Sequence, residues 1–141
     1  MTKPIPYASL SSEEKRLVDS ACEVCKFAYC PYSNFPVGSA ISTDDGKIFT
    51  GCNVENAAWS PSICAERVAV GKAVSEGYRK FKAIAIFCGT RQGGWSCGVC
   101  LQFLREFGLD LVIISVVDQD KSVLKKPLSE LLPNSFGPES L

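Results

Sequence analysis

Apolar and polar positions along the chain follow two periodicities. Apolar residues recur every three to four positions in several segments, which predicts amphipathic helices. The first of these segments opens with Ser-Ser-Glu-Glu at residues 11–14, which resembles a capping box. Glycines at 77 and 108 mark the expected ends of two later helices. We expect four helices. The first is capped by Ser11 and ends before Pro31, and the second covers residues 63–76. The third is capped by Ser96 and runs to Phe107, and the fourth covers residues 128–132.

Shorter apolar and β-branched runs between these helices predict strands. Residues 37–42 and 47–52 are joined by Asp-Asp-Gly, which indicates a hairpin with a tight turn. Residues 81–88 and 111–117 are continuous apolar runs, typical of strands buried on both faces. The order helix, strand, strand, helix, strand, helix, strand predicts a three-layer α/β/α fold. In this fold the hairpin supplies an antiparallel edge, and the two apolar strands lie parallel.

Length and charge narrow the class of protein. We expect residues 1–141 to form one domain, which would bury about two-thirds of the surface of the unfolded chain. Fifteen basic and fifteen acidic residues cancel, which argues against nucleic acid as a partner because phosphate-binding proteins carry a basic excess. The first residues lack the apolar core of a signal peptide, and no stretch approaches the ~20 apolar residues of a membrane span. We therefore expect a cytoplasmic protein with no membrane partner.

Three cysteines and a glutamate provide the candidate chemistry. Cys64 opens the second expected helix, and Cys97 and Cys100 open the third. Three thiolates can hold zinc and leave a fourth position for water, which is the arrangement of a catalytic site. The chain has no histidine, so a carboxylate such as Glu66 would have to move protons. Arg67 could donate hydrogen bonds to the thiolates and offset the net negative charge of such a site.

Each of these residues also has a simpler interpretation. Free cysteine is among the most buried residue types, so Cys64 alone would be a core residue. The Cys97–Cys100 pair alone could be a redox dithiol, which would bind no metal. A structural zinc would need a fourth protein ligand, and neither motif contains a fourth thiol. Cys22 and Cys25 have the same spacing inside the first helix and are interpreted as packing, and Cys30, Cys52 and Cys88 are expected in the core.

Five stretches in order along the chain resemble a known family. They are residues 31–38 (PYSNFPVG), 51–57 (GCNVENA), 64–67 (CAER), 97–100 (CGVC), and 130–133 with 135–138 (ELLP, SFGP). The chain resembles the small zinc-dependent cytidine deaminases that act on free nucleosides. The resemblance implies a cytidine deaminase-like fold with a mixed sheet of about five strands. It also implies hydrolytic deamination of cytidine and 2′-deoxycytidine to uridine and 2′-deoxyuridine, in pyrimidine salvage, with a zinc-activated water and a glutamate proton shuttle.

The resemblance also implies roles for the matched residues. The three cysteines would bind Zn²⁺, and Glu66 would shuttle protons. The substrate would be a nucleoside. The alternative is a related deaminase that acts on a nucleoside antibiotic or on a base in a polynucleotide. Phe136 would reach into a neighbouring subunit's site, which implies a homotetramer with shared active sites. Asn53 and Glu55 would hold the ribose 3′-hydroxyl, and Phe35 would pack on the pyrimidine ring. The backbone of Ala65 would orient the base.

Two positions beside the third helix depart from the family pattern. Ser96 stands where the family usually has proline, and serine can also cap a helix. Leu101 stands where the family usually has arginine, which removes a positive charge beside the expected zinc site. We expect weaker charge compensation there, unless Arg91 or Arg105 supplies it.

Overall fold

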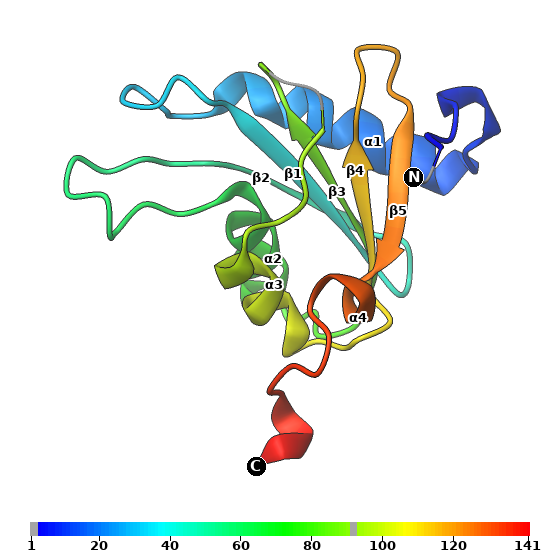
Figure 1. Ribbon diagram of the computed structural model, residues 1–141, viewed down its shortest axis with the longest axis vertical. Helices are drawn as coiled ribbons and strands as arrows, with labels where there is room; N and C mark the ends of the chain where they lie inside the picture. Colours follow the sequence, from blue (N-terminus) through cyan, green and yellow to red (C-terminus); the bar gives the residue numbers. More distant parts are fainter. Residues whose placement is uncertain (1–2, 91–92) are drawn as a thin grey trace.

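A five-stranded mixed sheet forms the centre of the structure, a computed structural model that describes residues 3–90 and 93–141. The strand order is β2-β1-β3-β4-β5, and the sheet twists across the molecule (Figure 1). Only β3 and β4 run parallel, as their apolar sequences predicted, and every other neighbouring pair is antiparallel. The strands are β1 (Val37–Thr43), β2 (Ile48–Cys52), β3 (Phe81–Cys88), β4 (Val112–Val116) and β5 (Val123–Pro127).

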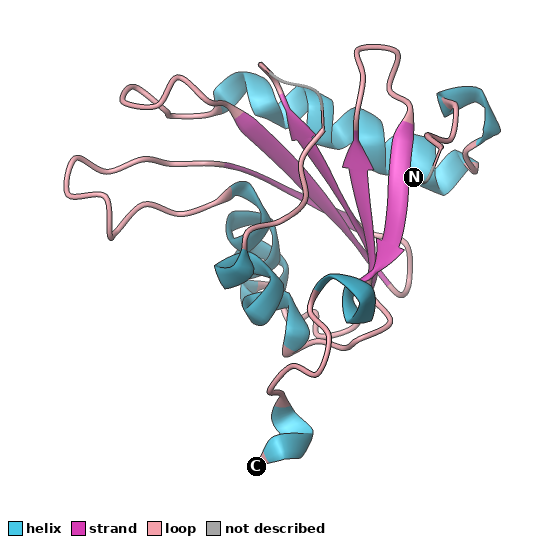
Figure 2. Cartoon of the chain, in the orientation of Figure 1, coloured by secondary structure: helices cyan, strands magenta, loops and turns pink. Residues whose placement is uncertain are grey.

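Helices cover both faces of the sheet, which gives the predicted three layers (Figure 2). Helix α1 (Ser12–Val24) lies on one face, and α2 (Ala65–Ser75) and α3 (Gly98–Arg105) lie on the other. In the described part of the chain, none of the helices combines the length and apolar character needed to cross a bilayer. The remaining elements are α4 (Leu128–Leu131) and three short 3₁₀ helices, Tyr7–Ser9, Cys25–Phe27 and Pro138–Ser140.

Two hydrophobic clusters lie on the two faces of the sheet. Because side chains alternate along a strand, Ile84 and Ile86 of β3 pack with Leu104 of α3, whereas Ala85 packs with Leu17 of α1. All five side chains are at least 97% buried. Gly38 of β1 lets α1 approach the sheet closely, because a Cβ atom there would lie only 2.0 Å from the carbonyl oxygen of Ala21.

Most element boundaries agree with the sequence to within two residues. Ser11 caps α1 through a capping box with Glu14, as predicted. The expectation that Ser96 caps the third helix is wrong, because Cys97 is the N-cap and the helix starts at Gly98. The first helix also ends earlier than expected, at Val24, where the chain tightens into a 3₁₀ turn.

Strand β5 had no predicted residue range. Its sequence, Val-Leu-Lys-Lys-Pro, lacks the continuous apolar run of β3 and β4, and lysine and proline are typical of sheet edges. Pairing with β4 on one side stabilises it, and Ile5 forms a β-bridge to Val123 on the other. Pairing with distant segments, rather than local sequence preference, therefore determines that these residues form a strand.

Candidate functional site

The first turns of α2 and α3 bring three thiols together. The Sγ atoms of Cys64, Cys97 and Cys100 all lie within 4.8 Å of one another, and this is the one such cluster of potential metal ligands among the described residues. Cys64 and Cys97 are the N-caps of the two helices, and neither side chain makes a capping hydrogen bond. Both thiols are therefore available to a shared ligand.

The donor set and its surroundings fit Zn²⁺. Tetrahedral zinc with bonds of about 2.3 Å to sulfur places its sulfur ligands about 3.8 Å apart. The Sγ atoms of Cys64 and Cys97 are 4.0 Å apart. Arg67 donates from Nη2 to Cys64 Sγ at 3.6 Å, while its buried Nε has no hydrogen-bond partner within the described chain. A guanidinium held against the thiols offsets the excess negative charge that three thiolates give a zinc site.

Electrostatics favour a thiolate in this cluster before any metal binds. The pKa of Cys64 is lowered to about 5, first by a hydrogen bond from Cys100 and further by Arg67. The same hydrogen bond, together with burial, raises the pKa of Cys100. Helix N-termini, which carry partial positive charge, act in the same direction as Arg67. A lowered pKa at Cys64 favours metal binding, because cysteine binds a metal as its thiolate.

Glu66 lies in the first turn of α2 and is only 4% exposed. Burial raises the pKa of its carboxyl group, while the nearby Ser96 hydroxyl favours the ionised form. Ser96 is itself buried, and its Oγ has no hydrogen-bond partner within the geometric limits among the described residues. A carboxyl group with a raised pKa next to a metal site can both accept and return a proton.

Strand β2 fixes the first turn of α2 by direct backbone contact. A Cβ atom on Gly51 would lie only 2.5 Å from the carbonyl oxygen of Ala65 and 2.5 Å from the backbone nitrogen of Ala69. Only glycine allows this approach. The packing sets the position of Ala65, whose side chain is fully buried, and therefore of Cys64 and Glu66 on either side of it.

Cys64, Cys97 and Glu66 line a cavity of about 440 Å³, while the third thiol, Cys100, is buried and is not part of the lining. This cavity brings together the expected substrate residues Phe35, Asn53, Glu55 and Ala65. Its described lining contains no lysine or arginine. The full lining is Ser33, Phe35, Val37, Asn53, Glu55, Cys64, Ala65, Glu66, Ile86, Cys88, Trp95 and Cys97.

Asn53 and Glu55 also shape the wall of the cavity. Asn53 donates from Nδ2 to the carbonyl oxygen of Phe35 at 2.9 Å and accepts from the Val37 N–H at 2.8 Å. Glu55 Oε1 accepts from the N–H groups of residues 32 and 33, each at 3.1 Å. The sequence did not reveal this second role, because it depends on a loop that is distant along the chain.

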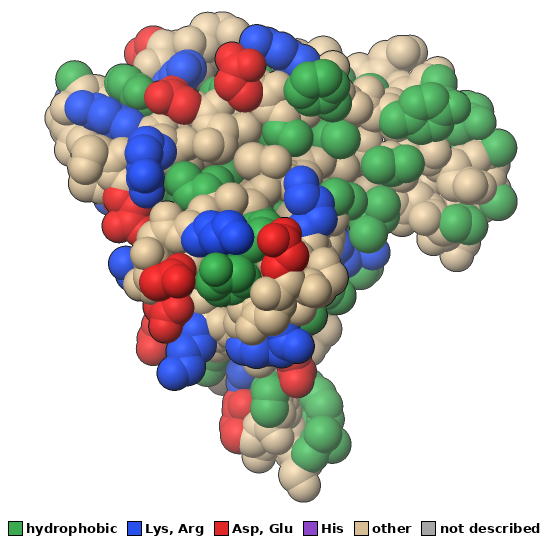
Figure 3. Space-filling view, turned by 180° about the vertical axis from the view of Figure 1, so that it is seen from behind, with side chains coloured by type: hydrophobic (Ala, Val, Ile, Leu, Met, Phe, Trp, Pro, Cys, Tyr) green, Lys and Arg blue, Asp and Glu red, His purple; other side chains and the backbone are tan. Residues whose placement is uncertain are grey.

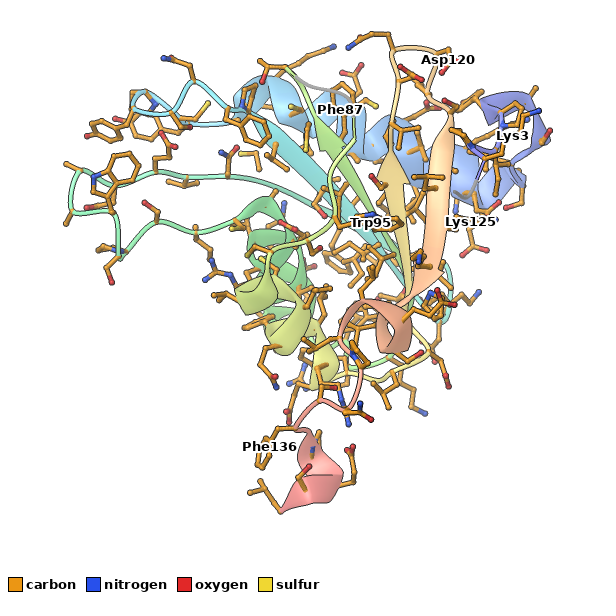
Figure 4. The ribbon with its side chains drawn as sticks, viewed as in Figure 1. Lys3, Phe87, Trp95, Asp120, Lys125 and Phe136 are labelled. Carbon is orange, nitrogen blue, oxygen red and sulfur yellow. The ribbon has the colours of Figure 1, made fainter. Side chains whose placement is uncertain are left out.

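Phe136 lies outside the cavity of its own chain. Figure 4 shows it at the C-terminal end, on the side of α3 away from Trp95. Its side chain is 60% exposed. Its carbonyl oxygen accepts from Gln102 Nε2 at 3.0 Å, which holds this end of the chain against α3. Any role for Phe136 in a cavity would therefore require a second copy of the chain.

Arg105 does not compensate charge at the thiols. It is buried, and it donates from Nε to Ser135 Oγ at 2.9 Å and from Nη2 to Glu139, both in the C-terminal segment. Arg91, the other expected source of charge, lies outside the described residues. Arg67 is the guanidinium that contacts the thiols, and Leu101 is buried in α3.

None of the described cysteines forms a disulfide. Cys88 is buried as expected and also lines the cavity, whereas Cys30 and Cys52 are only half-buried, so their assignment to the core is wrong. Trp95 is a further aromatic residue in the cavity lining, and the sequence motifs did not indicate it. Its position two residues before Cys97 was an available signal, because a neighbour of a metal ligand must lie near the site.

The sequence matches a family model and several proteins of that family along most of its length. A family model described as the zinc-binding region of cytidine and deoxycytidylate deaminases matches residues 11–116. A Dictyostelium discoideum protein named probable cytidine deaminase is 44% identical over 92% of this chain and 87% of its own length. A Sporosarcina psychrophila cytidine deaminase is 39% identical over 90% of this chain and 93% of its own length.

Solved structures give the same result for the fold. The crystal structure of a cytidine deaminase from Burkholderia pseudomallei matches with a TM-score of 0.82 and 38% identity, covering 90% of this chain and all of that chain. A cytidine deaminase structure from Mycobacterium tuberculosis matches with a TM-score of 0.77 and 35% identity, over 90% of this chain and 99% of that chain.

Proposed function

The chain belongs to the cytidine and deoxycytidylate deaminase family, and we propose that it converts cytidine to uridine by hydrolytic removal of the amino group. It is a zinc-dependent hydrolase. The observation that carries the proposal is a cluster of three thiols and a buried glutamate, of which Cys64, Cys97 and Glu66 line a cavity. A redox dithiol would need neither the third thiol nor this glutamate, so the arrangement favours deamination over that alternative.

In this proposal Cys64, Cys97 and Cys100 hold zinc. The bound metal supplies Lewis acidity that makes a water molecule nucleophilic near neutral pH. Glu66 would take one proton of the attacking water and give it to the ring nitrogen of the base. It would then move the remaining proton of the added hydroxyl to the amino group, which leaves as ammonia. Its burial suits this role because a raised pKa brings a carboxyl group closer to the pH at which it must exchange protons.

We further propose a nucleoside, rather than a nucleotide, as substrate. The described cavity lining offers two carboxyl groups and no cationic side chain, so a phosphate would meet repulsion without compensation. Phe35 would pack on the pyrimidine, and the Ala65 backbone would orient the base. Asn53 and Glu55 would hold the ribose 3′-hydroxyl, which cytidine and 2′-deoxycytidine share, so we propose both as substrates, in pyrimidine salvage.

A homotetramer with shared sites completes the proposal. Phe136 is exposed and held away from its own cavity, as an aromatic residue that serves another subunit would be. Hydrophobic side chains gather on the projecting loops and on the C-terminal segment, while charges of both signs are mixed over the body (Figure 3). The exposed loop aromatics include Tyr29, Tyr32 and Trp59. The free thiols are consistent with a cytoplasmic location, where cysteines stay reduced.

A substrate panel tests the reaction and the substrate class. Purified, zinc-quantified protein is incubated with cytidine, 2′-deoxycytidine and deoxycytidylate, and deamination is followed by ultraviolet absorbance. We expect conversion of both nucleosides and at least about tenfold lower kcat/KM for the nucleotide, because a doubly charged phosphate would be left unpaired. Preference for deoxycytidylate would contradict the nucleoside assignment.

Mixing two impaired variants tests the shared site. We expect Phe136→Ala to raise KM with zinc content unchanged. We then mix Phe136→Ala with Glu66→Gln under conditions that exchange subunits. A mixed tetramer contains some sites with an intact Glu66 and an intact Phe136 from a neighbour, so the KM of part of the activity should return to the parental value. Unchanged kinetics after verified subunit exchange would exclude the shared aromatic.

A further inference from the structure

Trp95 is the one large cavity-lining side chain with no assigned role. It lies on the segment that leads from β3 into α3, in the middle of the molecule (Figure 4). The side chain lines the same cavity as Glu66 and remains 37% exposed. An indole group left partly in water next to a cavity has apolar surface that a bound ligand can cover.

The backbone next to Trp95 is held firmly by the sheet. The hydroxyl of Ser115, a buried residue of β4, donates to the carbonyl oxygen of Gly94 at 2.9 Å and accepts from the Gly94 N–H at 3.1 Å. A Cβ atom on Gly94 would lie 3.0 Å from the Sγ of Cys88, so the absence of a side chain lets this segment pass close to β3. One side chain therefore binds both polar groups of Gly94 and fixes the residue that precedes Trp95.

Phe35 lines the cavity from a different segment and is anchored in a similar way. Asn53 binds its carbonyl oxygen, and the hydroxyl of Ser33 accepts from its N–H at 3.1 Å. The cavity therefore has two aromatic side chains, each on a backbone that hydrogen bonds hold in place. Such preorganisation lowers the entropy cost of binding a flat ring.

We propose that Trp95 contacts the bound nucleoside directly and supplies a second aromatic surface in the substrate cavity. The proposal extends the function proposed above and rests on it. Every nucleoside presents a flat apolar ring and an apolar sugar edge, and aromatic side chains pack on such surfaces without needing hydrogen bonds. Trp95 thus contributes mainly to substrate affinity, while the thiols and Glu66 carry out the reaction.

Intrinsic fluorescence provides a direct test, because Trp59 and Trp95 are the only tryptophans in the chain. Trp59→Phe leaves Trp95 as the sole reporter, and Trp95→Phe leaves Trp59. Each zinc-loaded variant is titrated with uridine, the product, which binds without being consumed. We expect a saturable fluorescence change in Trp59→Phe, with a midpoint equal to the inhibition constant of uridine against cytidine turnover. The change should be largely lost in Trp95→Phe.

Kinetics of Trp95→Ala and Trp95→Phe give the second readout. Loss of a base-stacking aromatic weakens binding by at least about fivefold, so we expect KM for cytidine to rise by that factor in Trp95→Ala. Trp95→Phe keeps a flat ring and should stay within about threefold of the parental KM. Zinc content and kcat should change little in either variant.

The outcomes separate this proposal from the proposed function. Normal turnover and uridine inhibition, with no fluorescence change in Trp59→Phe and an unchanged KM in Trp95→Ala, would overturn the role of Trp95 alone. A higher KM that accompanies zinc loss in Trp95→Ala would also overturn it, because Trp95 would then support the metal site. A parental protein that neither converts cytidine nor binds uridine would overturn both.

Discussion

Two cysteine pairs with identical spacing lie at opposite ends of their helices. Cys22 and Cys25 are in the last turn of α1, where Cys25 is the C-cap, whereas Cys97 is the N-cap of α3 and Cys100 lies in its first turn. The C-terminal end of a helix carries partial negative charge and disfavours a thiolate, and the N-terminal end favours one. Helix polarity therefore favours a thiolate in the second pair and disfavours one in the first.

The surroundings of the two pairs add to this difference. Burial raises the pKa of Cys22 to about 11, so its thiol stays neutral at physiological pH. Beside the second pair, Cys64 supplies a third thiol whose pKa is lowered to about 5, by Cys100 first and then by Arg67. A pair of cysteines becomes a metal site when the fold adds a third ligand and a cation, and the spacing alone does not reveal this.

The largest difference should appear when one cysteine of each pair is removed. In Cys97→Ala we expect zinc to fall from about one per chain to a small fraction of that, because two thiols rarely hold zinc. Cytidine turnover should fall to background. Cys22→Ala, the matched variant, should keep its zinc and most of its activity. Zinc is measured by mass spectrometry after desalting, and equal zinc contents in the two variants would refute the distinction between the pairs.

Within the metal-binding region, Glu66→Gln separates proton transfer from zinc binding. The substitution keeps the size of the side chain but removes its acid–base chemistry, so turnover should fall by at least about 10²-fold while zinc is retained. Glu76→Gln, at the far end of α2, is the control and should be near parental activity. Near-normal turnover by Glu66→Gln would assign the proton shuttle to another group.

Arg67→Met tests the contribution of the guanidinium that donates a hydrogen bond to the Cys64 thiol. Losing a partner that hydrogen-bonds to a ligand typically weakens metal affinity by about 10- to 100-fold. We expect a shift of that size in competition with a fluorescent zinc chelator. Arg79→Met, which removes a guanidinium bonded to backbone carbonyls at the end of α2, should leave zinc affinity unchanged. An equal loss of zinc affinity in both variants would indicate a general loss of protein stability rather than the loss of a hydrogen bond to the thiols.

The smallest expected effect is a change in the pH dependence of protein stability, caused by Cys22 of the first pair. The pKa of Cys22 is about 11 in the folded protein, against an ordinary value of 9.0. Between these values the unfolded chain releases the proton while the folded chain keeps it, so the free energy of unfolding falls as pH rises. The slope due to this thiol is at most about 1.4 kcal/mol per pH unit. Urea denaturation at pH 8.5 and 10.5 should show a smaller loss in Cys22→Ala than in the parental protein, and equal losses would exclude a buried neutral thiol.

Local sequence signals predicted much of the fold and of the site. The capping box at Ser11, the apolar runs of β3 and β4, and the cysteines at two helix starts each have a short-range physical cause. The family resemblance, drawn from five short stretches of sequence, and the zinc cofactor are confirmed by the family model and the relatives. The roles of individual site residues remain predictions for the experiments above.

Features that depend on contacts between distant segments were not predictable. Strand β5 exists because β4 offers it a partner, and Asn53 fastens a loop that lies 18 residues away in the chain. The cap of α3 was misplaced because Ser96 is a good capping residue by type, yet in the fold its hydroxyl is buried beside Glu66. Helix-capping preference is weak compared with the packing that positions the thiols.

Stepwise return of zinc to metal-free protein, with cytidine turnover measured at each step, tests the central claim most directly. If the three thiols hold the metal that deaminates cytidine, conversion to uridine should rise linearly and stop at about one zinc per chain, the capacity of one such site. Cys97→Ala should show no rise. Full activity in the metal-free protein, or one bound zinc per chain without conversion of cytidine, would contradict the claim.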